Sequence, residues 1–401
     1  MKKNIGSFSL MKNMNMSLIL SKIQEHTLIS RAQIAKETGL TAATVTNLTS
    51  ELIGDGVVIE CDTGNSTGGR KPIMLKMDTE KFGVCAAYIS PDKVEFVAAN
   101  LISDIIYYSS IPFDRKNKVS DCIDFISDEY LKIVADGKRK ILGLTVGLHG
   151  LVNSSNGVSV FAPNLEWENV DIAKKLKPKV NVPIFTDNDV RLMTLGEMWF
   201  GNAKNVKDMF YMYIGKGIGG TLVINGELYR GFGSGAGEIG HCIVKKDGPV
   251  CFCGNNGCLQ TAANTDAMKN SINEILKSNK YKTALTHRST LANLIHYHNI
   301  GDSGAKAVID NISHYLAMSM GTIVNLINPQ TIILDSSVKG FSEAAIPYIY
   351  KYLPKHCMKY QRSECKIIPS KLEEMAVLKG GAALAIKNMY ENPDILKRDN
   401  M

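Results

Sequence analysis

The chain has 401 residues, of which 45% are hydrophobic and 21% are charged, and its formal net charge is +7. A chain of this length and composition predicts roughly two or three globular domains with ample apolar material for their cores. No apolar run approaches the roughly 18 to 20 residues of a membrane span, and the N-terminus does not read as a signal peptide. We therefore expect a cytoplasmic protein without a membrane partner. The mild positive charge permits an acidic partner without requiring one.

The segment from 30 to 52 predicts two short helices joined by a tight turn. Ser30 and Thr41 can each cap a helix, and Gly39 suits a left-handed position after the first one. Positions spaced to pack inward are Ala32, Ile34, Ala35, Val45, Leu48 and Leu52. Two such helices with a glycine-containing turn of about three residues are typical of a helix-turn-helix.

The second of these helices presents short polar side chains outward, where hydroxyls can reach phosphates and Asn47 can contact a base edge. Two strands expected at 57–60 and 73–76 flank a glycine-rich loop at 61–71, which predicts a wing with a basic tip. We expect DNA contacts from Arg31, Thr41, Ala43, Thr44, Thr46, Asn47, Arg70 and Lys71.

The alternative is a helical hairpin that only packs against the rest of the chain. Charge does not decide between the two, because residues 1–80 hold nine Lys and Arg against eight Asp and Glu. The capped helix, wing and basic tip together favour a winged helix-turn-helix DNA-binding domain over residues 1–79.

From about residue 81 onward, short apolar runs alternate with helical segments, which favours an α/β architecture. The expected strands lie within 83–101, 141–147, 182–186, 209–214, 222–228 and 331–334. Glycine-rich stretches at 215–220 and 231–240 mark places where the backbone can approach a ligand closely.

Nine cysteines without a secretory signal indicate a reducing compartment, and three of them lie within eight positions. Cys251, Cys253 and Cys258, with His241 ten residues upstream, form a normal tetrahedral zinc set. Four protein ligands close the coordination sphere, so we expect a structural Zn²⁺ rather than a catalytic one. The alternative is three buried free cysteines beside an ordinary histidine.

Three further motifs accompany the cysteine cluster: PNLEW at 163–167, DNDVRLMTLGE at 187–197 and GAGEIGH at 235–241. With the helix-turn-helix they make the whole chain resemble the ROK family (repressors, open reading frames and kinases). The resemblance is to its sugar-responsive branch, which contains xylose and N-acetylglucosamine repressors.

This resemblance implies a two-lobed α/β fold of the hexokinase/actin-like (RNase H-like) type, with sugar bound between the lobes. We expect a small lobe at 80–199, completed by a C-terminal helix at 375–395. We expect a large lobe at 200–374, carrying the zinc loop and the dimerisation surface.

Transferred residue by residue, the resemblance assigns sugar contacts to Asn164, Asn188, Asp189, Glu238 and His241. In kinase members the residue at Asp189 is the base that takes a proton from the attacking hydroxyl. His241 would hold zinc with one ring nitrogen and face the sugar with the other. The alternative for the pair at 188–189 is a simple turn after a strand ending at 186.

Two departures affect the sugar side. The family usually places Leu-Glu after the cysteine motif, whereas this chain has Gln260, an amide that can donate as well as accept. We keep Gln260 among the sugar contacts and expect an altered sugar preference. Arg191 stands where asparagine is frequent, either on the helix surface or in the cleft.

Three departures affect the nucleotide side. The kinases' Asp-x-Gly-Gly-Thr loop is replaced by YISPD at 88–92, with Tyr88 in place of the aspartate and Pro91 removing a backbone donor. A second phosphate loop reads Gly-Lys-Gly at 215–217, and a late glycine pair is replaced by Asp-Ser-Ser at 335–337. Phosphoryl transfer depends on positioning and charge neutralisation, so we expect no catalytic residues and no kinase activity.

The resulting hypothesis is a homodimeric repressor, or a dimer of dimers, that binds palindromic operator DNA and responds to a sugar effector. The alternatives are an ATP-dependent sugar kinase with a fused DNA-binding domain, and a repressor that responds to a protein partner.

Overall fold

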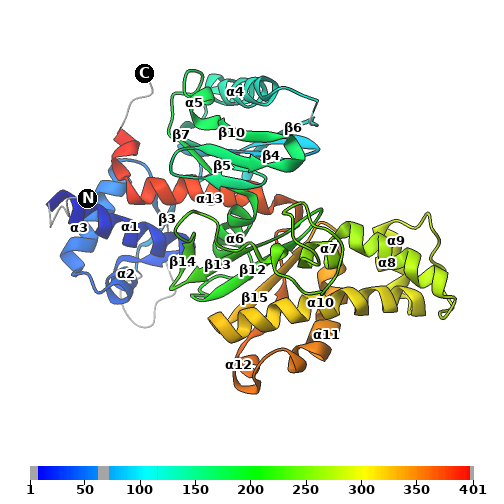
Figure 1. Ribbon diagram of the computed structural model, residues 1–401. Coiled ribbons are helices and arrows are strands. Elements are labelled where there is room, and N and C mark those ends of the chain that lie inside the picture. The colour runs from blue at the N-terminus through cyan, green and yellow to red at the C-terminus, as the bar shows by residue number, and fades with distance from the viewer. Residues whose placement is uncertain (1–7, 62–71, 115, 398–401) are drawn as a thin grey trace. The chain divides into compact units, whose positions relative to one another are not determined.

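The computed structural model describes residues 8–61, 72–114 and 116–397. The chain forms two compact units (Figure 1). The first extends to Leu192 and includes the residues from Val377 onward, and the second is Met193–Ala376.

The first unit begins with three helices and a small antiparallel sheet of order β1-β3-β2. These elements are α1 (Phe8–His26), β1 (Ile29–Ser30), α2 (Arg31–Thr38), α3 (Ala42–Gly54), β2 (Val58–Cys61) and β3 (Met74–Met77). The two predicted strands are confirmed to within one residue. The fully buried side chains of this part include Ile19, Leu20, Ile23, Ile34, Val45, Leu52 and Leu75.

The predicted helix signals are confirmed. The Ser30 hydroxyl accepts a hydrogen bond from the backbone N–H of Gln33, and Thr41 caps α3 in the same way. Gly39 has φ of 73° and closes α2. Ala32 is exposed, so its predicted inward position is wrong. At 100° per residue Ala32 lies roughly 160° around the helix from the buried Ile34.

The larger sheet of the first unit has the order β11-β7-β4-β5-β6. Its strands are β4 (Phe82–Ile89), β5 (Lys93–Asn100), β6 (Ile105–Pro112), β7 (Lys140–Leu148) and β11 (Ile184–Asn188). The neighbours β4, β7 and β11 run parallel to one another. Strand β5 runs antiparallel to both of its neighbours, β4 and β6. The run expected at 83–101 is therefore a hairpin of two strands.

Helices cover both faces of this sheet (Figure 1). Cys85 and Ala87 of β4 share a core cluster with Tyr130 of α4 (Val119–Asp136). Ala86, between them, points to the other face, where a Cβ on Gly381 of α13 (Ala376–Glu391) would lie 2.9 Å from the Ala86 Cβ. Burial on both faces explains why β4 reads as a continuous apolar run.

A second small sheet, of order β10-β9-β8, also belongs to the first unit. Its strands and the adjoining helices are β8 (Leu151–Asn153), β9 (Val158–Ala162), η1 (Pro163–Leu165), β10 (Trp167–Asp171) and α5 (Ile172–Leu176), with η5 (Pro393–Lys397) after α13. Helix α6 (Asp189–Phe200) begins in the first unit and continues into the second.

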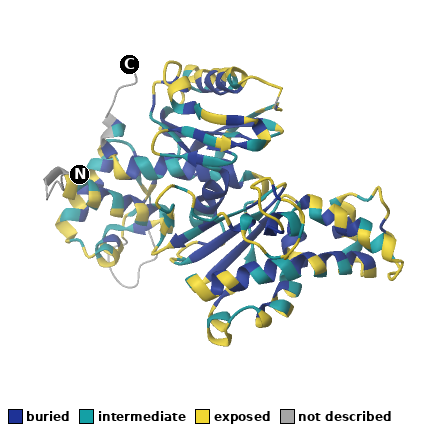
Figure 2. Cartoon of the chain, in the orientation of Figure 1, coloured by how far each residue is buried: buried dark blue, intermediate teal, exposed yellow. Residues whose placement is uncertain are grey.

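The second unit is built on a sheet of order β14-β13-β12-β15-β16. Its strands are β12 (Met209–Ile214), β13 (Ile218–Ile224), β14 (Glu227–Tyr229), β15 (Thr331–Ser336) and β16 (Lys366–Pro369). The helices are η2 (Ile239–His241), α7 (Leu259–Ala263), α8 (Thr265–Ser278), α9 (Leu291–Asn299), α10 (Ser303–Ile327), α11 (Phe341–Tyr352), η3 (Leu353–Lys355), α12 (Lys359–Glu364) and η4 (Glu373–Met375). The central strands are buried, whereas α8 and α12 carry many exposed residues (Figure 2).

The strand expected at 182–186 lies two residues later, at Ile184–Asn188. Pro183 precedes it and has no N–H to donate to a ladder, although its carbonyl accepts from Leu144. Asn188 is therefore the last residue of a parallel strand and Asp189 is the first of a helix, so the simple-turn alternative is wrong.

Candidate functional site

Polar side chains gather where the three parallel strands of the first unit end. Tyr88 lies near the end of β4, His149 directly follows β7, and Asn188 and Asp189 lie where β11 meets α6. Carboxyl ends of neighbouring parallel strands share one edge of the sheet, and open α/β sheets bind ligands at such edges.

Asp189 is the centre of this group. Its Oδ2 accepts hydrogen bonds from the Tyr88 hydroxyl at 3.0 Å and from His149 Nδ1 at 3.1 Å. Its Oδ1 accepts from Asn188 Nδ2 and from the backbone N–H of Val190, both at 2.9 Å. A carboxylate offers about four lone-pair positions, so these four donors match its accepting capacity.

His149 links this group to Asn164, whose Nδ2 lies 2.9 Å from His149 Nε2. An amide nitrogen only donates, so Nε2 accepts and the ring proton sits on Nδ1, facing Asp189. The structure thus joins Asn164, Asn188 and Asp189, three of the predicted sugar contacts. Sequence reasoning missed His149, although a His-Gly pair directly after an apolar strand was a usable signal.

Arg191 is 4% exposed, so it is not a helix-surface residue. Its guanidinium lies 3.3 Å from Oδ1 of the buried Asp187, which also accepts from the Ser154 hydroxyl at 2.8 Å. A buried charge requires a partner of this kind. Arg191 therefore links the first turn of α6 to the end of β11.

The segment that replaces the kinases' first phosphate loop is a closed hairpin turn between β4 and β5. The backbone N–H of Ser90 donates to the Lys93 carbonyl at 3.0 Å, and the Ser90 hydroxyl lies 2.9 Å from Asp92 Oδ1. These groups already have partners, and a carboxylate at this turn repels phosphate.

The late glycine pair of the kinases is replaced by residues at the end of β15 in the second unit. The Asp335 carboxylate accepts from the buried Tyr211 hydroxyl at 2.6 Å and from the backbone N–H of Ser336 at 2.7 Å. Burial raises the pKa of Asp335 to about 6. This carboxylate is part of the interior of the unit.

The predicted metal ligands come together in the second unit. One ligand atom each from His241, Cys251, Cys253 and Cys258 lies within 4.8 Å of the others. His241 Nδ1 is 3.6 Å from Cys251 Sγ, and Cys253 Sγ is 3.7 Å from Cys258 Sγ. Zinc bonds are about 2.3 Å to sulfur and about 2.0 Å to nitrogen. At tetrahedral angles these lengths place two sulfurs about 3.8 Å apart and a nitrogen and a sulfur about 3.5 Å apart, close to the two separations in the structure.

The cysteines of this cluster differ in their surroundings. A hydrogen bond from the backbone at Asn255 lowers the pKa of the exposed Cys253 thiol to about 7. Burial raises the pKa of the Cys258 thiol to about 12. A metal cation favours both thiolates, because it binds the deprotonated sulfur.

Around this cluster lie the predicted sugar contacts of the second unit. His241 turns Nδ1 to the cysteines and Nε2 toward Glu238, whose Oε2 is 4.0 Å away. Gln260 is buried, and its Nε2 donates to Cys251 Sγ at 3.0 Å. An amide can make this bond to a thiolate, whereas an ionised glutamate at the same position cannot donate.

The exposed face of α3 carries Thr41, Ala43, Thr46 and Asn47, as expected, while Thr44 is half-buried. Arg31 is bound within its own domain instead, to Thr49 at 2.9 Å and to Glu60 at 2.7 Å. Its predicted DNA contact stays a prediction. The predicted contacts Arg70 and Lys71 lie outside the described residues.

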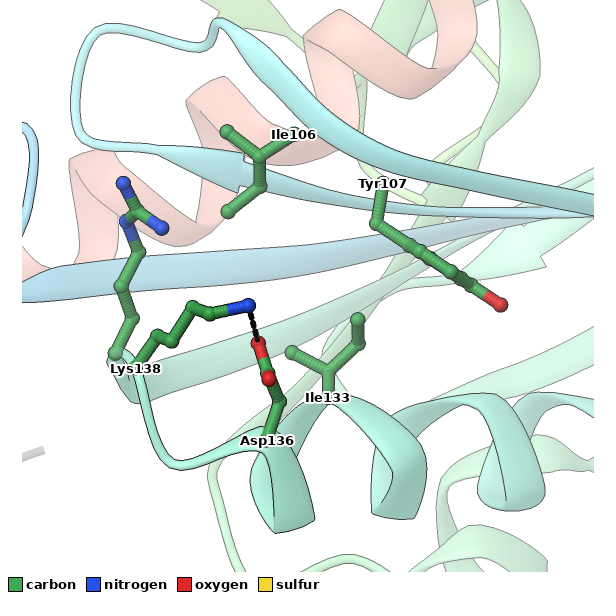
Figure 3. A pocket seen from close by; sticks show the side chains of 6 residues that line it. Ile106, Tyr107, Ile133, Asp136 and Lys138 are labelled. Carbon is green, nitrogen blue, oxygen red and sulfur yellow. Dashed lines mark ion pairs between the residues drawn. The ribbon is translucent and has the colours of Figure 1, made fainter.

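A pocket of about 230 Å³ lies between β6 and the end of α4 (Figure 3). Its lining residues are Ile106, Tyr107, Ile133, Asp136, Lys138 and Arg139. The 3.0 Å ion pair in it joins side chains that are 51% and 72% exposed, so this is an open surface depression. None of the predicted sugar contacts lines it.

The ROK family matches residues 93–388. The chain belongs to the ROK family. The xylose repressor of Caldicellulosiruptor bescii is 29% identical over 397 residues, an alignment that covers 97% of this chain and 100% of that repressor. The predicted resemblance is therefore confirmed.

Solved structures share the fold. A ROK family transcriptional regulator, a homologue of the Escherichia coli MLC protein, superposes with a TM-score of 0.84 over 97% of this chain and 100% of that one, at 22% identity. A ROK glucokinase from Streptomyces griseus with glucose and AMPPNP gives 0.65 over 75% of this chain and 98% of the kinase, at 21% identity. The expected kinase-like α/β fold is confirmed. Within the described residues, no helix combines the length and apolar character of a membrane span.

Proposed function

We propose that this chain is a transcriptional repressor whose affinity for operator DNA is modulated by a bound sugar. Its relative from C. bescii is named a xylose repressor, and a regulator of the family shares its fold over nearly the whole chain. The proposed parts are a winged helix-turn-helix at 1–79, a small lobe at 80–199 completed by residues 375–395, and a large lobe at 200–374.

One observation carries the proposal: helix α3 is capped, packed on one face and polar on the other. Val45, Leu48 and Leu52 are buried, while Thr46 and Asn47 are exposed. A short helix after a three-residue turn, with small polar side chains outward, can enter a major groove.

The sugar contacts we propose are Asn164, Asn188, Asp189, Glu238, His241 and Gln260. The three that lie in the first unit are already held in place by hydrogen bonds. Such ordering before binding reduces the loss of side-chain entropy when a ligand binds. Sugar binding then shifts the population of DNA-competent protein by its differential affinity for the two states.

We propose a structural Zn²⁺ held by His241, Cys251, Cys253 and Cys258, since the 3.6 Å and 3.7 Å separations between ligand atoms match a tetrahedral set. The metal would supply folding free energy to the loop. It would also fix the ring of His241, with Nε2 directed away from the cysteines. The hydrogen bond that Gln260 Nε2 donates to Cys251 Sγ orients one of these ligands.

The chain acts as a regulator and not as a kinase in this proposal. The turn at 90–92 is closed on itself, and the Asp335 carboxylate is committed to the Tyr211 hydroxyl. ATP-dependent phosphorylation of a sugar by the purified protein, lost in Asp189→Asn, would overturn this part.

The test of the main proposal is a mobility-shift titration with DNA fragments selected from a random-sequence pool. We expect a two-fold symmetric consensus, because a homodimer presents two recognition helices. Asn47→Ala should weaken binding by about 5- to 150-fold, as expected for the loss of a base contact of about 1–3 kcal/mol. Asn299→Ala, an exposed asparagine on α9, is the matched control.

The effector part is tested by repeating the titration with a panel of mono- and disaccharides. A coupling of ~2 to 3 kcal/mol changes DNA affinity about 30- to 150-fold. A chain that selects no DNA sequence refutes the repressor. Selected DNA whose binding no sugar changes refutes the effector role.

A further inference from the structure

Helix α1, the first helix of the chain, is apolar on two opposite faces. Its inward side chains Ile19, Leu20 and Ile23 are fully buried. At about 100° per residue, positions nine apart lie on opposite sides of a helix. Leu10 therefore lies opposite Ile19, and in the same way Met14 lies opposite the third buried residue. A helix that is hydrophobic all round is normally a buried helix, so the outward face of α1 is expected to have a cover.

The outward apolar side chains form one continuous row, which we call the α1 stripe. Its members are between 47% and 60% exposed, and they are Leu10, Met11, Met14 and Leu18. Single exposed apolar residues are normal on a protein surface, whereas a contiguous group marks an interaction site. The two methionines can adapt their shape to an apolar partner.

The charge of the α1 stripe indicates which partner covers it. Positions 10, 11, 14, 17, 18 and 21 share the outward face, and all six are uncharged. The two lysines of the helix are engaged within the chain: Lys12 Nζ lies 2.7 Å from Glu51 Oε2, and Lys22 Nζ lies 2.6 Å from Glu25 Oε2.

A nucleic acid or an anionic lipid surface requires cations that are free to meet its phosphates. A second copy of the chain has the opposite requirement. Across a two-fold axis the same patch meets itself, so any charge on the patch would face a like charge. A neutral apolar stripe therefore fits a second copy of this chain.

We propose that the α1 stripe packs against the α1 stripe of a second copy across a two-fold axis. The inference goes beyond the proposed repressor; it rests on the proposed homodimer but not on DNA or sugar binding. Helix α1 is ion-paired to α3 through Lys12 and Glu51, and to α2 through Lys22 and Glu37 at 3.4 Å. A contact between two α1 helices therefore sets the separation of the two α3 helices, the proposed recognition helices.

The small size of the α1 stripe determines how this contact acts. A stable interface that stands alone takes roughly 20 to 30 residues a side. The four side chains of the stripe are too few for that, so the α1 contact adds to an association made by another surface of the homodimer. Within such a dimer the contact is effectively intramolecular, and a small apolar contact can form.

Photo-cross-linking of the full-length chain, without DNA, tests the contact. The photoreactive residue p-benzoyl-L-phenylalanine replaces Leu18, and the irradiated protein is separated on a denaturing gel. Covalent dimers are digested, and the joined peptides are identified by mass spectrometry. We expect α1 of one copy to be joined to α1 of the other. Sedimentation velocity on the same sample reports whether the chain is a dimer.

A charge placed in the stripe locates the effect. Met14→Glu, added to the photoreactive chain, should lower the yield of covalent dimer at least about tenfold, because two like charges would face each other across the axis. Met14 is exposed, so the thermal midpoint should stay near that of the parent chain. Ala32→Glu is the matched control: it adds the same charge at an exposed position of α2, and the yield should be retained.

The cross-link of the photoreactive chain alone keeps the inference falsifiable if Met14→Glu does not fold. A sedimenting dimer that gives no covalent dimer, or one in which α1 is joined to a different surface, overturns the α1 contact and leaves the repressor unaffected. A yield that Met14→Glu leaves unchanged does the same. A monomeric chain overturns both the α1 contact and the proposed homodimer.

Discussion

Adding one methyl group at Gly380 tests how closely α13 packs on the first turn of α6, the turn that begins with Asp189. A Cβ built on Gly380 would lie 1.7 Å from the carbonyl oxygen of Leu192 and 2.4 Å from its carbonyl carbon. Both neighbours are backbone atoms, so no side-chain rotation can relieve the clash. Gly380→Ala therefore requires one helix to move by more than about 1 Å, because an ordinary contact needs about 3.4 Å or more.

Two opposing effects set the magnitude. Alanine in a helix interior is favoured over glycine by about 1 kcal/mol. Overpacking a tight contact costs about 1–3 kcal/mol, and a backbone contact belongs at the upper end of that range. We expect Gly380→Ala to lower the free energy of unfolding by about 1–2 kcal/mol.

The measurement is urea unfolding followed by circular dichroism, with midpoints compared at equal protein concentration. Gly54→Ala on α3 is the matched control, because a Cβ on Gly54 meets nothing within 4 Å. We expect the control to be neutral or more stable by up to about 1 kcal/mol. A Gly380→Ala variant as stable as the wild type would refute the close packing of the two helices.

Burial, metal ligation and capping each give a further prediction. Burial raises the folded-state pKa of Asp335 from 3.8 to about 6. The protonated carboxyl therefore adds to the free energy of unfolding below pH 3.8, and this addition is lost as the pH rises through about 6. We expect the free energy of unfolding to fall by about 3 kcal/mol between about pH 4 and pH 7. Asp335→Asn should flatten that part of the stability curve measured by urea unfolding, and an unchanged slope contradicts the assignment. Purified protein should contain one zinc per chain by atomic absorption. Cys258→Ser should lose it and Cys242→Ser, an exposed cysteine outside the cluster, should keep it; equal zinc in both would contradict the ligand set. Thr41→Ala removes the cap of α3 and should lower the free energy of unfolding, measured in urea, by about 1 kcal/mol, whereas Thr41→Ser should retain the wild-type value. Equal stability of the two variants would contradict the role of the cap.

Features that depend on residues close in the chain could be predicted from the sequence. The caps at Ser30 and Thr41 and the left-handed Gly39 each involve partners within about four positions, so a short window contains the whole interaction. The metal cluster is similar, because its four ligands lie within eighteen residues and their types suit zinc. The family resemblance extended this interpretation to the kinase-like fold.

Contacts between distant segments required the folded chain. Tyr88, His149 and Asp189 lie at the ends of three strands that are neighbours in the sheet but separated by tens of residues in the chain. No local pattern predicts their pairing. The buried Arg191 has the same explanation, since the packing of other segments decides which face of a helix is covered. The sequence alone showed that Tyr88 had replaced a phosphate-loop residue. Only the parallel alignment of the strands placed its hydroxyl on Asp189.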